Sequence, residues 1–113
     1  MPRKSKIVDA PPAAVQETLE RLGRNIRTAR VRRKLQQGEL ARRIGVSRFV
    51  VASIEKGKPS TGIAAYVGAL WALGLLDDMR AVADPDRDEE GKIFERARSP
   101  KTAGSGRTLS DEF

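Results

Sequence analysis

The sequence predicts an all-α fold, and two observations carry that prediction. Apolar residues recur at steps of three and four along several segments, which is the period of an amphipathic helix. Glycine and proline interrupt these segments at short intervals, and the alternation typical of strands is missing. We expect five helices within residues 12–83, a flexible basic arm over 1–11 and a charged tail over 84–113.

The first helix is expected from about Pro12 to Lys34. Proline suits a first helical turn, where its missing N–H costs little. Gly23 costs a helix about 1 kcal/mol relative to alanine, so a break there, with residues 13–21 as an appended segment, is an open alternative. The inward stripe consists of Val15, Leu19, Leu22, Ile26 and Ala29.

Two short helices joined by a tight turn follow. The first covers residues 37–44, and Gly45 ends it because glycine adopts the left-handed conformation at low cost. Ser47 is a good N-cap for the second, which runs to Glu55 or Lys56. The apolar face of the first short helix consists of Leu40, Ala41 and Ile44.

Two further helices complete the expected domain. Gly57 and Pro59 end the preceding helix, and Ser60 or Thr61 is expected to cap the next one. Gly74 ends that helix, and a fifth covers about 75–83. The inward face of the fourth helix is expected to be Ile63, Val67, Leu70 and Leu73.

The tail has a different composition from the domain. Residues 88–98 can form a short helix around Ile93 and Phe94, whereas the composition from Ser99 onward is typical of disorder. The net charge of +7 is also unevenly distributed. Residues 1–76 carry 15 basic and 5 acidic side chains, whereas 77–113 carry 7 and 10. This asymmetry favours a nucleic-acid surface with a separate tail, although charge alone fits a merely soluble basic protein equally well.

Several classes of function are disfavoured by composition. The chain has no cysteine and no histidine, so thiolate metal sites and the usual hydrolase constellations cannot be built. We therefore expect no enzyme and no cofactor. No apolar run approaches the ~20 residues of a membrane span, and the N-terminus lacks the apolar stretch of a secretory signal. We expect a cytoplasmic, nucleoid-associated protein without membrane contact.

Residues 35–58, LQQGELARRIGVSRFVVASIEKGK, carry the most specific motif. They resemble the signature of the phage-repressor-like, XRE-family helix-turn-helix regulators. LGRNIRTARVRRKL resembles the first helix of that family and ALWALGL its fourth, so the resemblance covers about residues 20–76. The matching positions are Gln37, Leu40, Ala41, Gly45, Val46, Ser47, Val51, Ile54, Glu55 and Gly57.

The residues support a reading helix independently of the resemblance. Ala41 suits the crossing of two helices, and Val46, Val51 and Ile54 give the second helix an inward face. In a helix-turn-helix the outward face, especially at its N-terminal end, enters the major groove. The outward residues here are Ser47, Arg48, Phe49, Ala52, Ser53 and Lys56; a solvated face with no ligand is the alternative.

Individual roles can be assigned on that face. Arg48 can bind guanine O6 and N7 through two hydrogen bonds, with a phosphate contact as the alternative. Phe49 can pack on a thymine methyl group, with intramolecular packing or a partner contact as alternatives. Ser47 and Ser53 are weaker base contacts.

Other positions are expected to bind the DNA backbone or to support the fold. Gln37 matches the family position that binds a phosphate, and a helix N-terminus favours an anion. The resemblance also pairs Glu55 with Arg30 as a structural ion pair. Gln36 and Gly38 depart from the family pattern and weaken the first turn of their helix by about 1–2 kcal/mol. Further phosphate candidates, with simple solvation as their alternative, are Arg43, Lys56 and Lys58.

The partners follow from the short reach of one helix-turn-helix, which reads only a few base pairs. A homodimer on a palindromic double-stranded operator is expected, with half-sites roughly 34 Å apart. Its candidate surfaces are the fifth helix and Trp71, Leu75 and Leu76, although Trp71 fits the core equally well. Arg3, Lys4 and Lys6 in the arm can bind phosphates or enter a minor groove.

The run from Leu75 onward is similar to that of HipB-type antitoxins, which repress their own operon and bind a HipA-like kinase toxin. The sequence therefore predicts a repressor acting as such an antitoxin. The alternatives are a stand-alone phage-type repressor and an interaction module with non-specific nucleic-acid binding.

Overall fold

The computed structural model describes residues 5–98 of the chain, and every element in this range is helical. The prediction of an all-α fold is therefore confirmed. The chain divides into two compact units, with the boundary between Arg80 and Ala81. Arg3, Lys4 and the segment from Ser99 onward lie outside the described residues.

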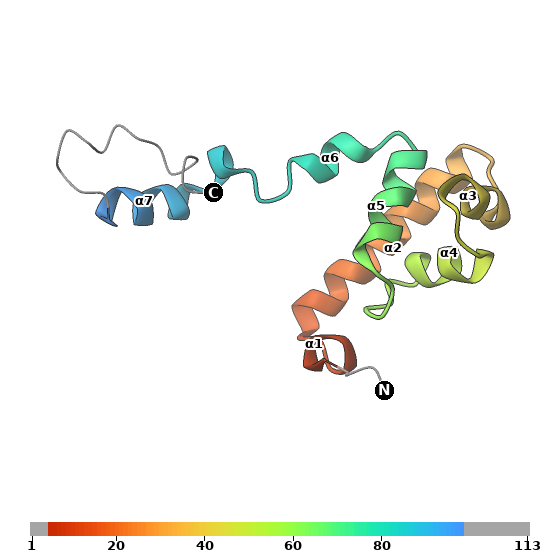
Figure 1. Cartoon of the computed structure of the whole chain (residues 1–113), viewed down its shortest axis with the longest axis horizontal. Helices are drawn as coiled ribbons and strands as arrows, with labels where there is room; N and C mark the ends of the chain where they lie inside the picture. The colour runs from red at the N-terminus through yellow and green to blue at the C-terminus, as the bar shows by residue number, and fades with distance from the viewer. Residues whose placement is uncertain (1–4, 99–113) are drawn as a thin grey trace. The chain divides into compact units, whose positions relative to one another are not determined.

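The first unit is built around one long helix (Figure 1). A single turn, α1, precedes it, and four shorter helices follow it. The long helix α2 packs against α4, and α3 contacts both α4 and α5. The bounds are α1 Lys6–Asp9, α2 Ala13–Arg32, α3 Gln37–Ile44, α4 Arg48–Glu55, α5 Ile63–Ala72 and α6 Leu76–Arg80.

The core lies between α2, α3, α4 and α5. Each helix contributes side chains at helical spacing, so burial of their apolar faces holds the short helices in place. Ile26, Leu40, Val51 and Ile54 are completely buried, as the sequence predicts. Val46 and Val50 lie at the edge of the same core and are half-buried.

Gly23 does not break α2, so the continuous helix is confirmed and the alternative of a break there is wrong. The glycine is buried, and a Cβ atom built on it would lie 2.5 Å from the carbonyl oxygen of Ile54. Gly57, which follows α4, approaches α2 nearer to its N-terminus. A Cβ atom built on Gly57 would lie 2.6 Å from Cα of Glu20. Both glycines thus permit close backbone approach, and the start of α2 belongs to the domain.

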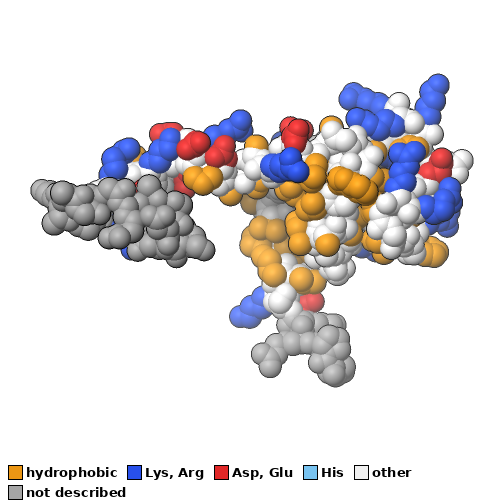
Figure 2. All heavy atoms as spheres, turned by 45° about the horizontal axis from the view of Figure 1, so that its top comes forward, with side chains coloured by type: hydrophobic (Ala, Val, Ile, Leu, Met, Phe, Trp, Pro, Cys, Tyr) orange, Lys and Arg blue, Asp and Glu red, His pale blue; other side chains and the backbone are white. Residues whose placement is uncertain are grey.

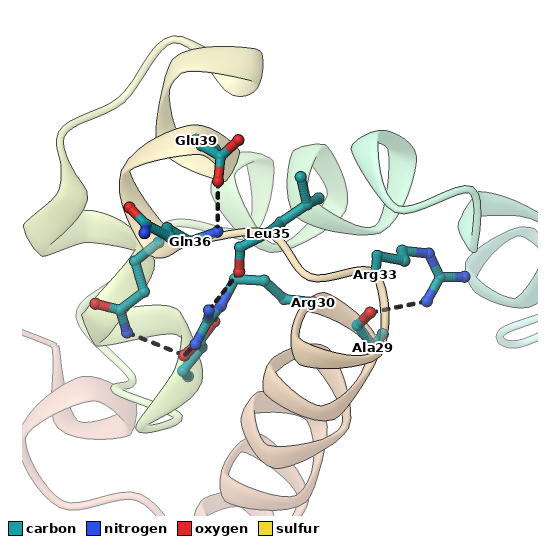
Figure 3. A network of polar contacts seen from close by, with 8 residues as sticks. Ala29, Arg30, Arg33, Leu35, Gln36 and Glu39 are labelled. Carbon is teal, nitrogen blue, oxygen red and sulfur yellow. Dashed lines mark hydrogen bonds and ion pairs between the residues drawn. The ribbon is translucent and has the colours of Figure 1, made fainter.

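The first turn of α3 has a cap that the sequence did not predict. The Glu39 carboxylate accepts a hydrogen bond from the backbone N–H of Gln36 at 2.9 Å (Figure 3). A glutamate three residues after the N-cap satisfies a backbone donor there. It offsets part of the weakness predicted from Gln36 and Gly38.

The start of α5 differs from the prediction. Gly62, rather than Ser60 or Thr61, occupies the N-cap position, without a side-chain hydrogen bond. Ile63 is 68% exposed instead of inward, and Tyr66 is buried in the core. Leu70 and Leu73 of the expected stripe are buried and Val67 is half-buried, so the prediction fails only at the first turn of the helix.

Three smaller features also differ from the sequence interpretation. Residues 6–9 of the expected flexible arm form α1. The fifth predicted helix is shorter, because α6 ends at Arg80. Trp71 is 60% exposed, which rules out its assignment to the core, while Leu75 packs against the core.

The second unit contains a 3-10 turn, η1, at Pro85–Arg87 and a helix, α7, at Glu89–Arg98. The helix lies within the expected range of 88–98. Asp88 accepts a hydrogen bond from the backbone N–H of Gly91 at 2.9 Å, which caps its start. Neither element contains a buried residue, and Ile93 and Phe94 are exposed.

Candidate nucleic-acid interface

The turn between α3 and α4 has the geometry of a helix-turn-helix. Gly45 adopts the left-handed conformation at φ +75°, and the N–H of Val46 returns to the carbonyl of Ala41 at 3.0 Å. Ser47 then caps α4, because its hydroxyl accepts a hydrogen bond from the Val50 N–H at 3.4 Å. Ala41 is buried where α3 packs against α4, as expected of a small residue at a helix crossing.

Glu55, the last residue of α4, is held by an ion pair from α2. Its carboxylate accepts hydrogen bonds from Nε of Arg30 at 2.6 Å and from Nη2 at 3.0 Å. Both residues are buried, with exposed fractions of 7% for Glu55 and 8% for Arg30. The structure thus forms the pair that the family resemblance implies.

Two further bonds extend this pair into a clamp. Arg30 also donates to the carbonyl of Leu35 at 2.8 Å, which fixes the chain entering α3 (Figure 3). Gln37 donates from its side-chain amide to Glu55 at 3.0 Å. We call these four residues the Glu55 clamp; it joins the C-terminal end of α4 to α2 and to the start of α3.

Gln37 therefore has a role beyond the predicted phosphate contact. Its side chain is half-buried, and one amide N–H is engaged by Glu55. An amide nitrogen carries two N–H groups, so one donor remains for a phosphate. The phosphate contact stays a prediction, whereas the structural bond could not be foreseen from the spacing of Gln37 and Glu55 along the chain.

The N-terminal end of α4 carries the predicted base-reading residues. Arg48 and Phe49 are exposed, and 73% of the Phe49 surface faces solvent. The alternative in which Phe49 packs inside the domain is therefore wrong. The guanidinium carbon of Arg48 lies 5.5 Å from the centroid of the Phe49 ring, within the range of a cation–π contact. Ser53, one turn further on, is half-buried.

A shallow hollow of about 320 Å³ opens beside the Phe49 ring. It separates α4 from the loop that precedes α5, so both elements face any ligand that lies across it. Apolar carbon and hydroxyl groups both line it. The lining residues are Phe49, Val50, Ser53, Ser60, Thr61, Gly62 and Ala65.

Exposed basic side chains flank this surface. Arg43 lies on α3, and Lys56 and Lys58 follow α4; all three are exposed. Figure 2 shows Lys and Arg side chains gathered at the end of the first unit that holds α3 and α4 in Figure 1. Such a cluster attracts a phosphate backbone.

The sequence interpretation missed Tyr66. Its hydroxyl donates to the backbone carbonyl of Lys58 at 3.0 Å, which fixes the loop after α4. Burial raises the pKa of this hydroxyl above the ordinary value of 10.0. An aromatic residue with a polar tip among apolar neighbours was the available signal, since a buried tyrosine usually requires a hydrogen-bond partner.

Residues 5–98 offer neither a metal site nor a membrane span. No group of acidic side chains in this range is arranged to hold a metal ion. No helix there is both long and apolar enough to cross a membrane.

Comparisons with known proteins agree with the motif. The family model described as a helix-turn-helix domain matches residues 21–83, which is more than half of the 113-residue chain. No curated protein and no solved structure matches the chain significantly. The left-handed turn at Gly45, the Ser47 cap and the matched range all lead to one assignment: the chain belongs to the helix-turn-helix domain family, which indicates a DNA-binding regulator.

Proposed function

We propose that this protein is a sequence-specific transcriptional repressor of the phage-repressor-like, XRE type, with no catalytic activity. The observation that carries the proposal is the outward face of α4. Its two leading side chains are exposed while the opposite end of the helix is held by the Glu55 clamp. A rigid helix with a free N-terminal face is what major-groove recognition requires.

The proposed contacts follow from exposure and chemistry. Arg48 binds a guanine, Phe49 contacts a thymine methyl, and Ser47 and Ser53 add weaker base contacts. The phosphate backbone is bound by the second amide N–H of Gln37 and by three exposed cations, which are Arg43, Lys56 and Lys58.

A single reading helix contacts only a few base pairs, so the proposal includes a homodimer on a palindromic operator. Trp71 supports this part, because a tryptophan that is 60% exposed is typical of an interface. A dimer places two copies of α4 about one helical turn of DNA apart.

Selection of bound duplexes from a random library tests the proposal. The expected result is a palindromic motif with half-sites roughly ten base pairs apart. The rival function, non-specific nucleic-acid binding by an interaction module, gives salt-dependent affinity that is equal for all sequences. Recovery of no motif would contradict the repressor proposal and support this rival.

A second candidate function is that of an antitoxin of the HipB type. The observation that favours it is α7, an ordered helix that leaves Ile93 and Phe94 exposed. Such a helix is typical of a segment that completes its packing on a partner. The proposed partner is a HipA-like kinase toxin encoded beside this chain.

Co-expression with the product of the adjacent gene tests that candidate. A stable complex is expected for the natural chain, and the double substitution Ile93→Ala, Phe94→Ala should weaken it. Replacement of Val82, which is also exposed but lies outside α7, by alanine is the matched control. A stand-alone repressor is indicated if the adjacent product is no kinase or forms no complex.

A further inference from the structure

Arg48 and Phe49 form one unit on the surface of α4. They are its first two residues, and the guanidinium carbon lies 5.5 Å from the ring centroid. With 73% of its surface in solvent, Phe49 contributes little to the core. Its ring lies instead beside the charged group of Arg48.

This contact restricts the side chain that is to read the DNA. A free arginine samples many rotamers, and ordering it on binding costs conformational entropy. A guanidinium within about 6 Å of an aromatic centroid is attracted to the ring. The ring therefore favours conformations that keep the guanidinium beside it before DNA arrives, so both groups approach the groove together.

The two groups lie close enough together to contact neighbouring base pairs. Neighbouring base pairs are about 3.4 Å apart along the duplex. Because the guanidinium carbon and the ring centroid are 5.5 Å apart, the two groups reach the same base pair or the next one rather than distant positions. When the guanidinium binds O6 and N7 of a guanine, the ring lies over the edge of the neighbouring base. A pyrimidine presents its C5 position there.

We propose that Arg48 and Phe49 jointly read a guanine and a 5-methylpyrimidine next to it, and that the ring responds to the methyl group rather than to the base that carries it. This inference rests on the proposed function, since it names the DNA that the same surface binds. Thymine carries the methyl group naturally, and cytosine gains it on C5 methylation. Binding is therefore sensitive to cytosine methylation.

The chemistry of the ring supports this choice. Phenylalanine has no hydrogen-bond donor or acceptor, so it does not distinguish the carbonyl of thymine from the amino group of cytosine. Contact with the ring is favourable for a methyl group, which is apolar, but not for a water molecule. The adjoining hollow is lined by Val50 and Ala65 as well as by the ring, so a methyl group that enters it contacts apolar carbon.

The experiment uses the full chain and the operator obtained by selection. The guanine bound by Arg48 is first located as the position whose preference is lost in Arg48→Ala. Duplexes that differ only in the pyrimidine next to that guanine, namely thymine, uracil, cytosine and 5-methylcytosine, are then compared. Adding the methyl group should raise affinity about fourfold, both from uracil to thymine and from cytosine to 5-methylcytosine. This is the ratio expected for burying one carbon.

Substitution of the ring provides the decisive comparison. Phe49→Ala should abolish both methyl effects, whereas Val31→Ala, at an exposed apolar residue of α2, should preserve them. Thermal melting checks that both variants fold. The inference is overturned if the protein binds thymine and uracil duplexes with equal affinity, or if the methyl effects persist in Phe49→Ala. Either result leaves the proposal of a repressor unaffected. Recovery of no motif would overturn both.

Discussion

Gly23 lies against the carbonyl of Ile54, so that a Cβ atom on Gly23 would be 2.5 Å from the Ile54 oxygen. The carbonyl oxygen of Glu55 would be 2.7 Å away. Because both neighbours are backbone atoms at the end of the reading helix, they cannot rotate away as a side chain can. This contact sets how closely α4 approaches α2.

Gly23→Ala is expected to destabilise the protein despite the better helix propensity of alanine. Propensity contributes about 1 kcal/mol in favour of the variant, but overpacking against backbone costs up to about 3 kcal/mol. A net loss of about 1–2 kcal/mol should lower the midpoint of thermal unfolding. Gly38→Ala is the matched control, because open space surrounds that glycine in α3, and it should raise the midpoint.

Glu55→Ala should unfold the domain more than it alters sequence preference. Removing one partner leaves the Arg30 guanidinium buried without its charge partner, which costs about 3–5 kcal/mol. Chemical denaturation measures the loss. Asp77→Ala breaks the exposed pair with Arg80 and should change stability by less than about 0.5 kcal/mol. Equal effects of the two substitutions would argue against the clamp.

Gln37→Glu should destabilise the protein more than Gln37→Ala. The alanine variant loses one hydrogen bond to a charged group, worth about 1.5–3 kcal/mol. The glutamate variant also places a second carboxylate beside Glu55. Equilibrium unfolding of both variants gives the order, and a more stable glutamate variant would contradict the geometry of the clamp.

Alanine substitution of Arg43, Lys56 or Lys58 should weaken binding to all duplexes by similar factors. Removing a cation that neutralises one phosphate should reduce the slope of log affinity against log salt by about 0.9. Titrations at several salt concentrations measure this slope. Lys92→Ala, which removes a cation from the second unit, should leave it unchanged. If a substitution leaves the slope unchanged, the side chain it removes is solvated and does not neutralise a phosphate.

The stability of the protein should fall at high pH because of Tyr66. Burial raises the pKa of Tyr66, so the folded state favours the neutral hydroxyl. This contribution is fully present below the unfolded pKa of about 10, and it is lost as pH rises through the folded pKa. Urea unfolding between about pH 8 and pH 11 should show the loss.

Tyr66→Phe is the control for that pH dependence. It should cost about 1 kcal/mol at neutral pH, because the Lys58 carbonyl loses its donor. Its stability should then vary less with pH above 10 than that of the natural chain. The chain contains one tyrosine, so near-ultraviolet absorbance reports the ionisation of Tyr66 directly. Titration at the ordinary pKa would contradict the effect of burial.

Local signals predicted the turn between α3 and α4 best. Gly45 acts through its own backbone and Ser47 through a hydroxyl that accepts from a residue three positions on, so sequence alone identified the turn and the cap. The role of Gly23 could not be predicted, because helix propensity describes one helix, whereas the close approach to Ile54 requires a second one. Glu39 was missed for a different reason: its spacing from Gln36 fits a capping box without the usual Ser or Thr.

The face of α5 and the role of Gln37 also required three-dimensional information. Almost every residue of α5 is apolar, so periodicity could not separate the exposed Ile63 from the buried Tyr66. The bond from Gln37 to Glu55 joins residues 18 positions apart. Such contacts depend on how three helices pack, which no local pattern encodes.

The Glu55 clamp and the Arg48–Phe49 pair occupy opposite ends of an eight-residue helix. Substitutions at sites without shared partners usually have additive effects. The reading end can therefore be diversified while the anchored end stays constant. A library randomised at Arg48, Phe49 and Ser53 should yield folded proteins with new operator preferences, which makes this short helix a suitable scaffold for redesign.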